Sequence, residues 1–371
     1  MKKLLYTVSL IFLCLMLSGW GSKGHKKISQ NTAAALPAQL SFLIPSWTNF
    51  IASHASDADY RKNDDPDESP RHYIDIDNYP EFVQYGSISQ NYDSVVAKYG
   101  YNFVIDQGIL PWATLRVFDS LKSCFQRGDW NRSALYAADL GHYVGDGHMP
   151  LHITRNYNGQ MTGQSGIHSR YETSMVTKYE SQITYTTDSA QFITDVSGFV
   201  FDYLYHDYTY VDSILAADDH ARLTTGSTSS DAYYQALWSR SGNFTIMLMR
   251  NGSNALASLI YTAWVQAGSP MFYPNAIDDL TMNPRARILQ NYPNPVKNNT
   301  IIPVEIVKHG KVTISILDAT GRIKEILLEQ TLEPGNHEIP LNAGNYPDGM
   351  YVILLRTGDE DTISKTFTVK N

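Results

Sequence analysis

Residues 142–152 read HYVGDGHMPLH and lie within an apolar stretch of the chain. Nothing in this stretch breaks a helix before Pro150, so the pattern predicts a buried helix from residue 132 to about residue 149. His142 and Asp146 are four residues apart and therefore share one face of that helix. Pro150 ends the helix and turns the chain, so the last histidine of the stretch approaches from a different direction.

The same four-residue spacing recurs in HSRYE, where His168 and Glu172 share one face of a second helical segment. With His152 between the two pairs, the sequence gathers imidazole and carboxylate groups that are costly to bury unpaired. A divalent metal removes that cost, and nitrogen with carboxylate oxygen is a ligand set that zinc accepts. A single pair is weak evidence, because a lone histidine on an apolar face is more often a satisfied core residue. Two pairs joined by a further histidine favour a metal site.

The length and the first residues predict a secreted protein of two domains. A chain of 371 residues is longer than one compact core usually holds. Residues 1–19 have the charged start, the apolar stretch and the small-residue exit of a signal peptide, and no later stretch is long enough for a membrane span. Cleavage after Gly19 makes Trp20 the new N-terminus, with a free α-amino group. It also removes Cys14 and leaves Cys124 without an intrachain disulfide partner.

The charge balance limits how the chain attracts a substrate. Loss of Lys2 and Lys3 with the signal changes the formal net charge from −8 to −10, with 27 Lys and Arg against 37 Asp and Glu. An acidic protein does not attract polyanions through its general field. A nucleic acid or a phospholipid head group would therefore have to be captured locally, by metal.

The hydrophobic period changes along the chain and divides it into two fold classes. Helical patterns dominate from residue 20 to about residue 266, most clearly over residues 25–43, 111–125, 191–204 and 231–266. Residues 53–70 are polar and acidic, which is typical of a loop. After about residue 284 the period becomes two, and six or seven short strands are expected, among them 300–307, 311–317 and 349–356. We therefore predict a signal peptide (1–19), an all-α catalytic domain (20–283) and a small all-β, Ig-like sandwich (284–371).

The last eighty-five or so residues resemble the C-terminal sorting domain of proteins exported by the bacterial type IX secretion system. The matching motifs are YPNP (292–295), LDATG (317–321), PG (334–335), GMY (349–351) and KTFTVK (365–370). The resemblance implies passage through the outer membrane, a location at the cell surface or outside the cell, and the secretion machinery as a partner. The alternative is an Ig-like module that binds carbohydrate or spaces the enzyme from a surface. We predict no stable protein partner beyond these.

Residues 20 to about 270 resemble a superfamily that comprises the bacterial zinc-dependent phospholipases C and the single-strand-specific zinc nucleases of fungi and plants. The resemblance rests, in order along the chain, on Trp20, His25, Asp57, Arg71-His72-Tyr73-Ile74-Asp75, His142, Asp146, His152, His168 and Glu172. It implies an all-helical domain around three zinc ions. It also implies three ligand sets, namely Asp57, His72, His142 and Asp146; His152, His168 and Glu172; and Trp20, His25 and the shared Asp146. Asp59 is the alternative to Asp57 if the acidic segment is registered differently.

The resemblance implies hydrolysis of a phosphodiester by a zinc-activated water, with Asp57 and Asp146 as catalytic residues. The short segment between His152 and His168, and Glu172 where the nucleases have Asp, favour a phospholipase C-like enzyme. The alternative is an endonuclease for single-stranded DNA or RNA with 3'-nucleotidase activity, in which Tyr73 and Asp75 bind a nucleobase. A second alternative is a non-catalytic module that zinc merely stabilises.

Overall fold

The computed structural model describes residues 20–43, 46–270, 286–289, 291–318, 322–357 and 361–370. The chain divides into two compact units, residues 1–272 and 273–371. The predicted signal peptide and the predicted domain boundary between residues 283 and 284 lie outside the described residues. None of the helices in the described part of the chain is long and apolar enough to cross a membrane.

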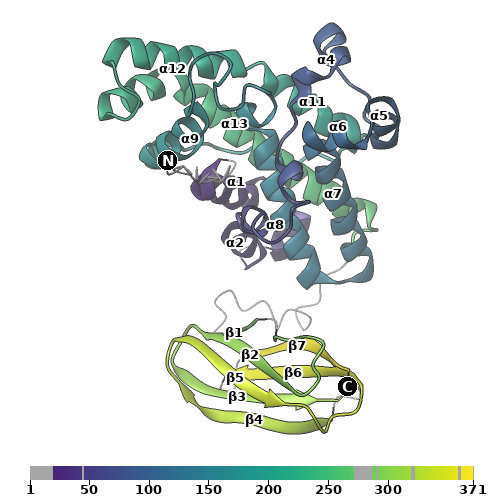
Figure 1. The fold of residues 1–371 in the computed structure, drawn as a ribbon. Helices are drawn as coiled ribbons and strands as arrows, with labels where there is room; N and C mark the ends of the chain where they lie inside the picture. The colour runs from purple at the N-terminus through teal and green to yellow at the C-terminus, as the bar shows by residue number, and fades with distance from the viewer. Residues whose placement is uncertain are drawn as a thin grey trace, which may run out of the picture. The chain divides into compact units, whose positions relative to one another are not determined.

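The regular secondary structure in the described residues of the first unit is entirely helical (Figure 1). Its elements are α1 (Gly21–Ala35), η1 (Ala38–Leu43), α2 (Ser46–Ser53), α3 (Asp57–Arg61), η2 (Ser69–His72), η3 (Ile76–Asn78), α4 (Pro80–Tyr85), α5 (Tyr92–Tyr99), α6 (Tyr101–Asp106), α7 (Leu110–Arg127), α8 (Trp130–Gly147), η4 (Pro150–His152), α9 (Ile167–Ser169), η5 (Arg170–Met175), α10 (Val176–Lys178), η6 (Glu180–Gln182), α11 (Val196–Tyr208), α12 (Val211–Thr225) and α13 (Asp231–Gln266).

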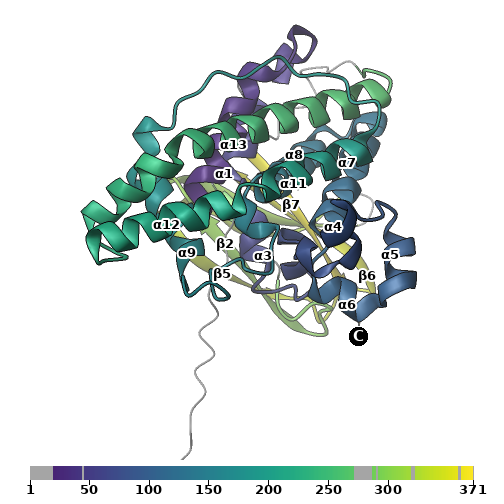
Figure 2. The same cartoon turned by 90° about the horizontal axis from the view of Figure 1, so that it is seen from above.

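Helix α8 lies at the centre of this unit. The Asp129 side chain caps it by accepting a hydrogen bond from the backbone N–H of Arg132, and Pro150 follows its end. Every residue from 140 to 154 is buried, as expected for a helix that is covered on all sides. Helices α1, α2, α7 and α13 pack against α8, and α13 runs across α1 and α7 as well (Figure 2). The predicted central helix is therefore present, two residues earlier than expected at each end.

Gly145 explains how α1 and α8 approach each other so closely. A Cβ atom at this position would lie 2.7 Å from Nδ1 of His25, closer than real Cβ contacts. Only glycine lets the His25 imidazole of α1 rest directly on the backbone of α8. Gly145 therefore leaves space for the His25 side chain beside His142 and Asp146.

The loop expected over residues 53–70 is interrupted by helices. Residues 53–70 do not form a continuous loop, because they contain the short helix α3 and the start of η2. Asp57 and Asp59 lie in the first turn of α3, where carboxylates favour the positive end of the helix dipole. The acidic composition that suggested a loop therefore supports a helix start.

The second unit consists of two antiparallel sheets. The strands are β1 (Ala286–Ile288), β2 (Asn299–Ile306), β3 (Gly310–Leu317), β4 (Ile323–Leu332), β5 (Gly335–Asn342), β6 (Gly349–Thr357) and β7 (Asp361–Val369). The sheet orders are β1-β2-β5 and β4-β3-β6-β7. Inward side chains of both sheets share one apolar core. Among them are Ile302 and Val304 of β2, Ile314 of β3 and Ile353 of β6. This confirms the prediction of a helical domain followed by a small β-sandwich.

Candidate metal centre

Eight imidazole and carboxylate side chains meet inside the helical unit. They are His25 of α1, Asp59 of α3, His72 of η2, His142 and Asp146 of α8, His152 of η4, His168 of α9 and Glu172 of η5. Each of them is buried, and the most exposed, Asp59, has 8% of its surface accessible. Seven of these residues are ligands that the sequence predicted, and Asp59 is the eighth. Together the eight come from seven helical elements.

The first group contains Asp59, His72, His142 and Asp146. Asp146 Oδ2 lies 3.0 Å from His72 Nδ1 and 3.3 Å from His142 Nε2. Asp59 Oδ1 lies 3.7 Å and 3.6 Å from the same two nitrogens, which are 3.0 Å from each other. Ligands bonded at about 2.0–2.1 Å to a tetrahedral zinc ion are about 3.3 Å apart. These five distances, 3.0–3.7 Å, are compatible with ligands of one zinc ion, although Asp59 Oδ1 also accepts a hydrogen bond from Lys62 Nζ at 2.7 Å.

The second group contains His152, His168 and Glu172. Glu172 Oε2 lies 3.4 Å from His152 Nε2 and 3.2 Å from His168 Nε2. Residues 170–175 form a π-helical turn, a variation that is frequent at functional sites. Three protein ligands are the number that catalytic zinc sites use, because the fourth position is left for water or substrate.

Asp146 connects the first group to His25. Its second oxygen, Oδ1, lies 3.4 Å from His25 Nε2 and 3.5 Å from His152 Nδ1. The His25 ring stacks on that of His142 at a centroid distance of 4.0 Å. Asp146 thus lies between two possible cation positions. Trp20, predicted to complete the third ligand set, is fully buried with its ring 6.0 Å from that of Tyr171. Its role as a ligand stays a prediction.

Three of the histidines are held by backbone carbonyl groups. His142 Nδ1 donates to the carbonyl oxygen of Ala55 (2.7 Å), and His152 Nδ1 donates to that of His72 (2.6 Å). His168 Nδ1 donates to the carbonyl oxygen of Tyr157 (3.0 Å). In the neutral form of each ring Nδ1 carries the hydrogen, so Nε2 has the lone pair and faces the cluster. This arrangement prepares all three imidazoles to bind a metal.

The cluster contains buried polar atoms for which the described residues provide no hydrogen-bond partner. They are both ring nitrogens of His25, Asp146 Oδ1, His152 Nε2, His168 Nε2 and Glu172 Oε2. Leaving such atoms unpaired costs about 1–3 kcal/mol each. Metal coordination removes this cost at one nitrogen of each histidine and at the carboxylate oxygens, although His25 Nδ1 stays without a partner, so the donor set fits the zinc ions that the sequence implies.

The charges within the cluster counteract the effect of burial on the pKa values of its members. Burial lowers the pKa of His142, but the carboxylates of Asp146 and Asp59 outweigh it and raise that pKa to about 9. Burial raises the pKa of Asp146, but His142 and His152 hold it well below its usual range. The carboxylates of the cluster are therefore ionised at neutral pH and available to a cation.

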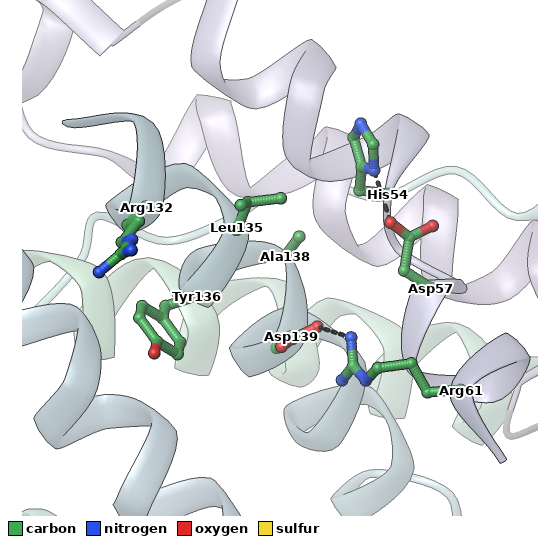
Figure 3. A pocket seen from close by; sticks show the side chains of 8 residues that line it. All are labelled: His54, Asp57, Arg61, Arg132, Leu135, Tyr136, Ala138 and Asp139. Carbon is green, nitrogen blue, oxygen red and sulfur yellow. Dashed lines mark hydrogen bonds and ion pairs between the residues drawn. The ribbon is translucent and has the colours of Figure 1, made fainter. Parts of the chain in front are cut away.

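Asp57 does not lie in the cluster, which corrects the predicted ligand set. Its Oδ2 lies 2.6 Å from Nδ1 of His54. Both side chains line a surface cavity of about 290 Å³ together with Arg61 and Asp139 (Figure 3). Residues two apart on a helix point in nearly opposite directions. Both residues belong to the first turn of α3, so the Asp57 carboxylate points to the surface while the Asp59 carboxylate points into the cluster.

Tyr73 and Asp75, the predicted substrate-binding residues, follow His72 and are half-buried. The Tyr73 hydroxyl donates to the backbone carbonyl of Asp106 at 3.4 Å. Burial and the neighbouring charge of Asp77 raise the pKa of Asp75 to about 7. Their contact with substrate stays a prediction.

Two exposed tyrosines, one next to Asp59 in the sequence and one in contact with His168, were not identified from the sequence. Tyr60 directly follows Asp59 and is 63% exposed. Tyr157, whose carbonyl oxygen orients His168, is 37% exposed, and its ring lies 6.1 Å from that of His168. No local pattern sets these two apart among the chain's 25 tyrosines.

A buried network fixes the segment between His152 and His168. Asp218 is fully buried and accepts hydrogen bonds from Gln164 Nε2 (3.0 Å), from Arg170 Nη2 (3.0 Å) and from the Tyr233 hydroxyl. Arg170 also donates to the backbone carbonyl of Gln164 at 3.1 Å. The network thereby ties the segment that carries Tyr157 to α12 and α13.

We expect Asp218→Ala to lower the free energy of unfolding of the helical unit by about 3 kcal/mol, because it leaves the Arg170 charge buried and unpaired. Urea unfolding followed by tryptophan fluorescence measures this, since all six tryptophans lie between residues 20 and 264. The matched control is Asp219→Ala, whose side chain is 58% exposed, with an expected change below about 0.5 kcal/mol. Equal losses for the two variants would contradict the role of the network.

Comparison with known proteins identifies the C-terminal segment. Residues 290–370 match the family model of the secretion system C-terminal sorting domain. Residues 290–370 form a secretion sorting domain. The chain is therefore exported through type IX secretion, to the cell surface or outside the cell, and its partner in this step is the secretion machinery. This confirms the predicted sorting domain and localisation.

Other comparisons concern larger parts of the chain. A probable serine protease of Bradyrhizobium tropiciagri is 24% identical over 216 residues, which are 50% of this chain and 27% of the relative's length. The chain thus spans about a quarter of that curated relative. Among solved structures, an alpha-toxin from Clostridium absonum has a TM-score of 0.40 and 15% identity, over 95% of this chain and 98% of the toxin. An alpha-toxin from an avian strain of Clostridium perfringens has a TM-score of 0.42 and 12% identity with the same coverage. These scores are low, and the functional argument rests on the chain's own residues.

Proposed function

We propose that the helical unit is a zinc-dependent phosphodiester hydrolase of the phospholipase C type, exported by means of its sorting domain. The observation that carries this proposal is the set of buried nitrogen and oxygen atoms around Asp146, spaced 3.0–3.7 Å apart in the first group. Zinc is the metal that such a mixed imidazole and carboxylate set favours. We infer three ions, because the sequence resemblance implies a third ligand set that includes Trp20, His25 and Asp146.

A phosphodiester is negatively charged and resists attack by hydroxide, so a catalyst must neutralise charge and provide a nucleophile. Zinc ions in this cluster would neutralise the phosphate and lower the pKa of a bound water. The second group, with three protein ligands, leaves room for a water or a phosphate oxygen.

The catalytic roles that the sequence suggested for Asp57 pass to Asp59 in this proposal. Asp59 is the most exposed member of the cluster, and its Oδ1 lies 3.6 Å from His142 Nε2. Its carboxylate orients the attacking water and accepts its proton. Asp146, fully buried between both cation positions, holds the imidazoles of His72 and His142 in place.

The choice of substrate depends on the surroundings of the cluster. The fifteen residues between His152 and His168 are pinned by Gln164 and Arg170 and leave little chain to enclose a base, which favours a phospholipid. A single-strand nuclease is the second candidate, because Tyr73 and Asp75 lie half-buried next to His72 and present a ring and a carboxyl group.

The test uses the mature form that begins at Trp20, loaded with zinc. We expect EDTA-sensitive release of phosphocholine from phosphatidylcholine, assayed beside single-stranded DNA, with close to three zinc ions per chain. Cleavage of DNA without release of phosphocholine would show that the enzyme is a nuclease and not a phospholipase C. Unfolding by EDTA without hydrolysis of either diester would indicate a zinc-stabilised module that is not an enzyme. A protein that binds no metal and hydrolyses neither substrate refutes the proposal.

A further inference from the structure

Glu68 is a fully buried carboxylate that none of the predicted ligand sets includes. Its Oε1 lies 3.2 Å from His72 Nε2 and accepts a hydrogen bond from the Tyr143 hydroxyl. Its Oε2 accepts hydrogen bonds from Arg61 Nε (3.3 Å) and Arg71 Nη1 (2.9 Å). The carboxylate therefore lies between two guanidinium groups on one side and a histidine of the cluster on the other.

His72 differs from the other oriented histidines in what holds it. Backbone carbonyl groups orient His142, His152 and His168, and these cannot be removed by substitution. His72 is oriented by a side chain, and it directs Nδ1 instead of Nε2 at the cluster, 3.0 Å from Asp146 Oδ2. Its position in the first group thus depends on one replaceable residue.

The direction of the hydrogen bond at Glu68 follows from its partners. A carboxylate that faces two guanidinium groups is ionised and accepts hydrogen bonds only. His72 must therefore carry its hydrogen on Nε2, which leaves the lone pair on Nδ1. That lone pair faces Asp146 and His142 of the first group.

We propose that Glu68 is a positioning residue that sets the tautomer of His72 and through it the zinc affinity of the first group. The proposal concerns the same cluster as the proposed function and rests on zinc being its metal. It does not depend on which diester is hydrolysed, or on whether any is.

Glu68→Gln is the variant that reverses this arrangement without changing shape. Arg61 and Arg71 can only donate, so the amide oxygen turns to them and the NH₂ group turns to His72. His72 Nε2 then has to accept, the hydrogen moves to Nδ1, and the lone pair no longer faces the cluster. The matched control is Tyr143→Phe, which removes the tyrosine hydrogen bond to Oε1 and leaves the carboxylate and its hydrogen bonds from Arg61 and Arg71 in place.

The experiment measures zinc binding by the full mature chain in competition with a chromophoric chelator, with folding checked by far-UV circular dichroism. We expect Glu68→Gln to weaken zinc binding at one site by about 10- to 100-fold, and Tyr143→Phe to change it by less than about twofold. Nitrogen-15 spectra of the imidazoles in zinc-loaded wild type should show one histidine protonated at Nε2 and metal-bound through Nδ1. That signal should be absent in Glu68→Gln.

Three results would overturn the inference. They are unchanged zinc affinity and imidazole spectra in Glu68→Gln, an equal loss of affinity in Tyr143→Phe, and a wild type that binds no zinc. Wild type that binds zinc but hydrolyses no diester refutes the proposed function alone, and the comparison of zinc affinities still decides the role of Glu68.

Discussion

Asp146→Asn is expected to reduce hydrolysis of the diester substrate by more than about 100-fold. Substitution of a residue that only supports a metal ligand typically costs about 10- to 100-fold, and Asp146 is a proposed ligand itself. Oδ2 of Asp146 lies 3.0 Å from His72 Nδ1, and Oδ1 lies 3.4 Å from His25 Nε2. Both oxygens are thus needed at cation positions, and an amide nitrogen in place of either cannot bind a cation. Steady-state kinetics with phosphatidylcholine and the zinc content of the purified variant measure the two effects.

The control for this variant is Asp119→Asn, an exposed carboxylate on the neighbouring helix α7 that forms a surface ion pair with Lys122. We expect its activity to stay within about twofold of wild type. If Asp146→Asn kept its zinc and its activity, Asp146 would have no part in the site and the proposed centre would be wrong.

Asp59→Asn and Asp57→Asn are expected to differ by more than about 100-fold in activity, although the two residues are neighbours on one short helix. Asp59 Oδ1 lies 3.6 Å from His142 Nε2, whereas Asp57 pairs with His54 at the surface. Loss of the Asp59 carboxylate removes a ligand and the proposed acceptor of the water proton. The kcat of each variant on the same substrate provides the comparison.

The pair contains its own control, because Asp57→Asn tests the ligand set that the sequence alone favoured. Full activity in Asp59→Asn together with loss of activity in Asp57→Asn would show that α3 is oriented differently in the working enzyme. Loss of activity in both would point to a requirement for the helix as a whole.

The sequence predicts this site well wherever helical spacing decides the geometry. Residues four apart, such as His142 with Asp146 and His168 with Glu172, share a face whatever the rest of the fold does. The long helix α13 also has the bounds that its pattern predicts, residues 231–266. In each case the decisive information is local.

The parts that the sequence could not predict depend on contacts between distant residues. The choice between Asp57 and Asp59 depends on which residue begins α3, and the acidic composition there is compatible with a loop. Glu68 draws no attention in a run of acidic residues, because its partners His72, Arg61 and Tyr143 come together only in the fold. The spacing of residues along one sequence does not show which distant residues come into contact.

Helix α3 has a consequence for how this protein can vary between relatives. In five residues it turns Asp57 to the surface, Asp59 to the cluster and Arg61 to Glu68, and it leaves Tyr60 exposed. One inserted or deleted residue rotates everything after it by about 100° and gives each task to the wrong side chain. Relatives of this protein can therefore vary Asp57 and Tyr60, but they have to keep Asp59, Arg61 and the length of α3, and gaps in aligned relatives should fall in the turn that follows the helix.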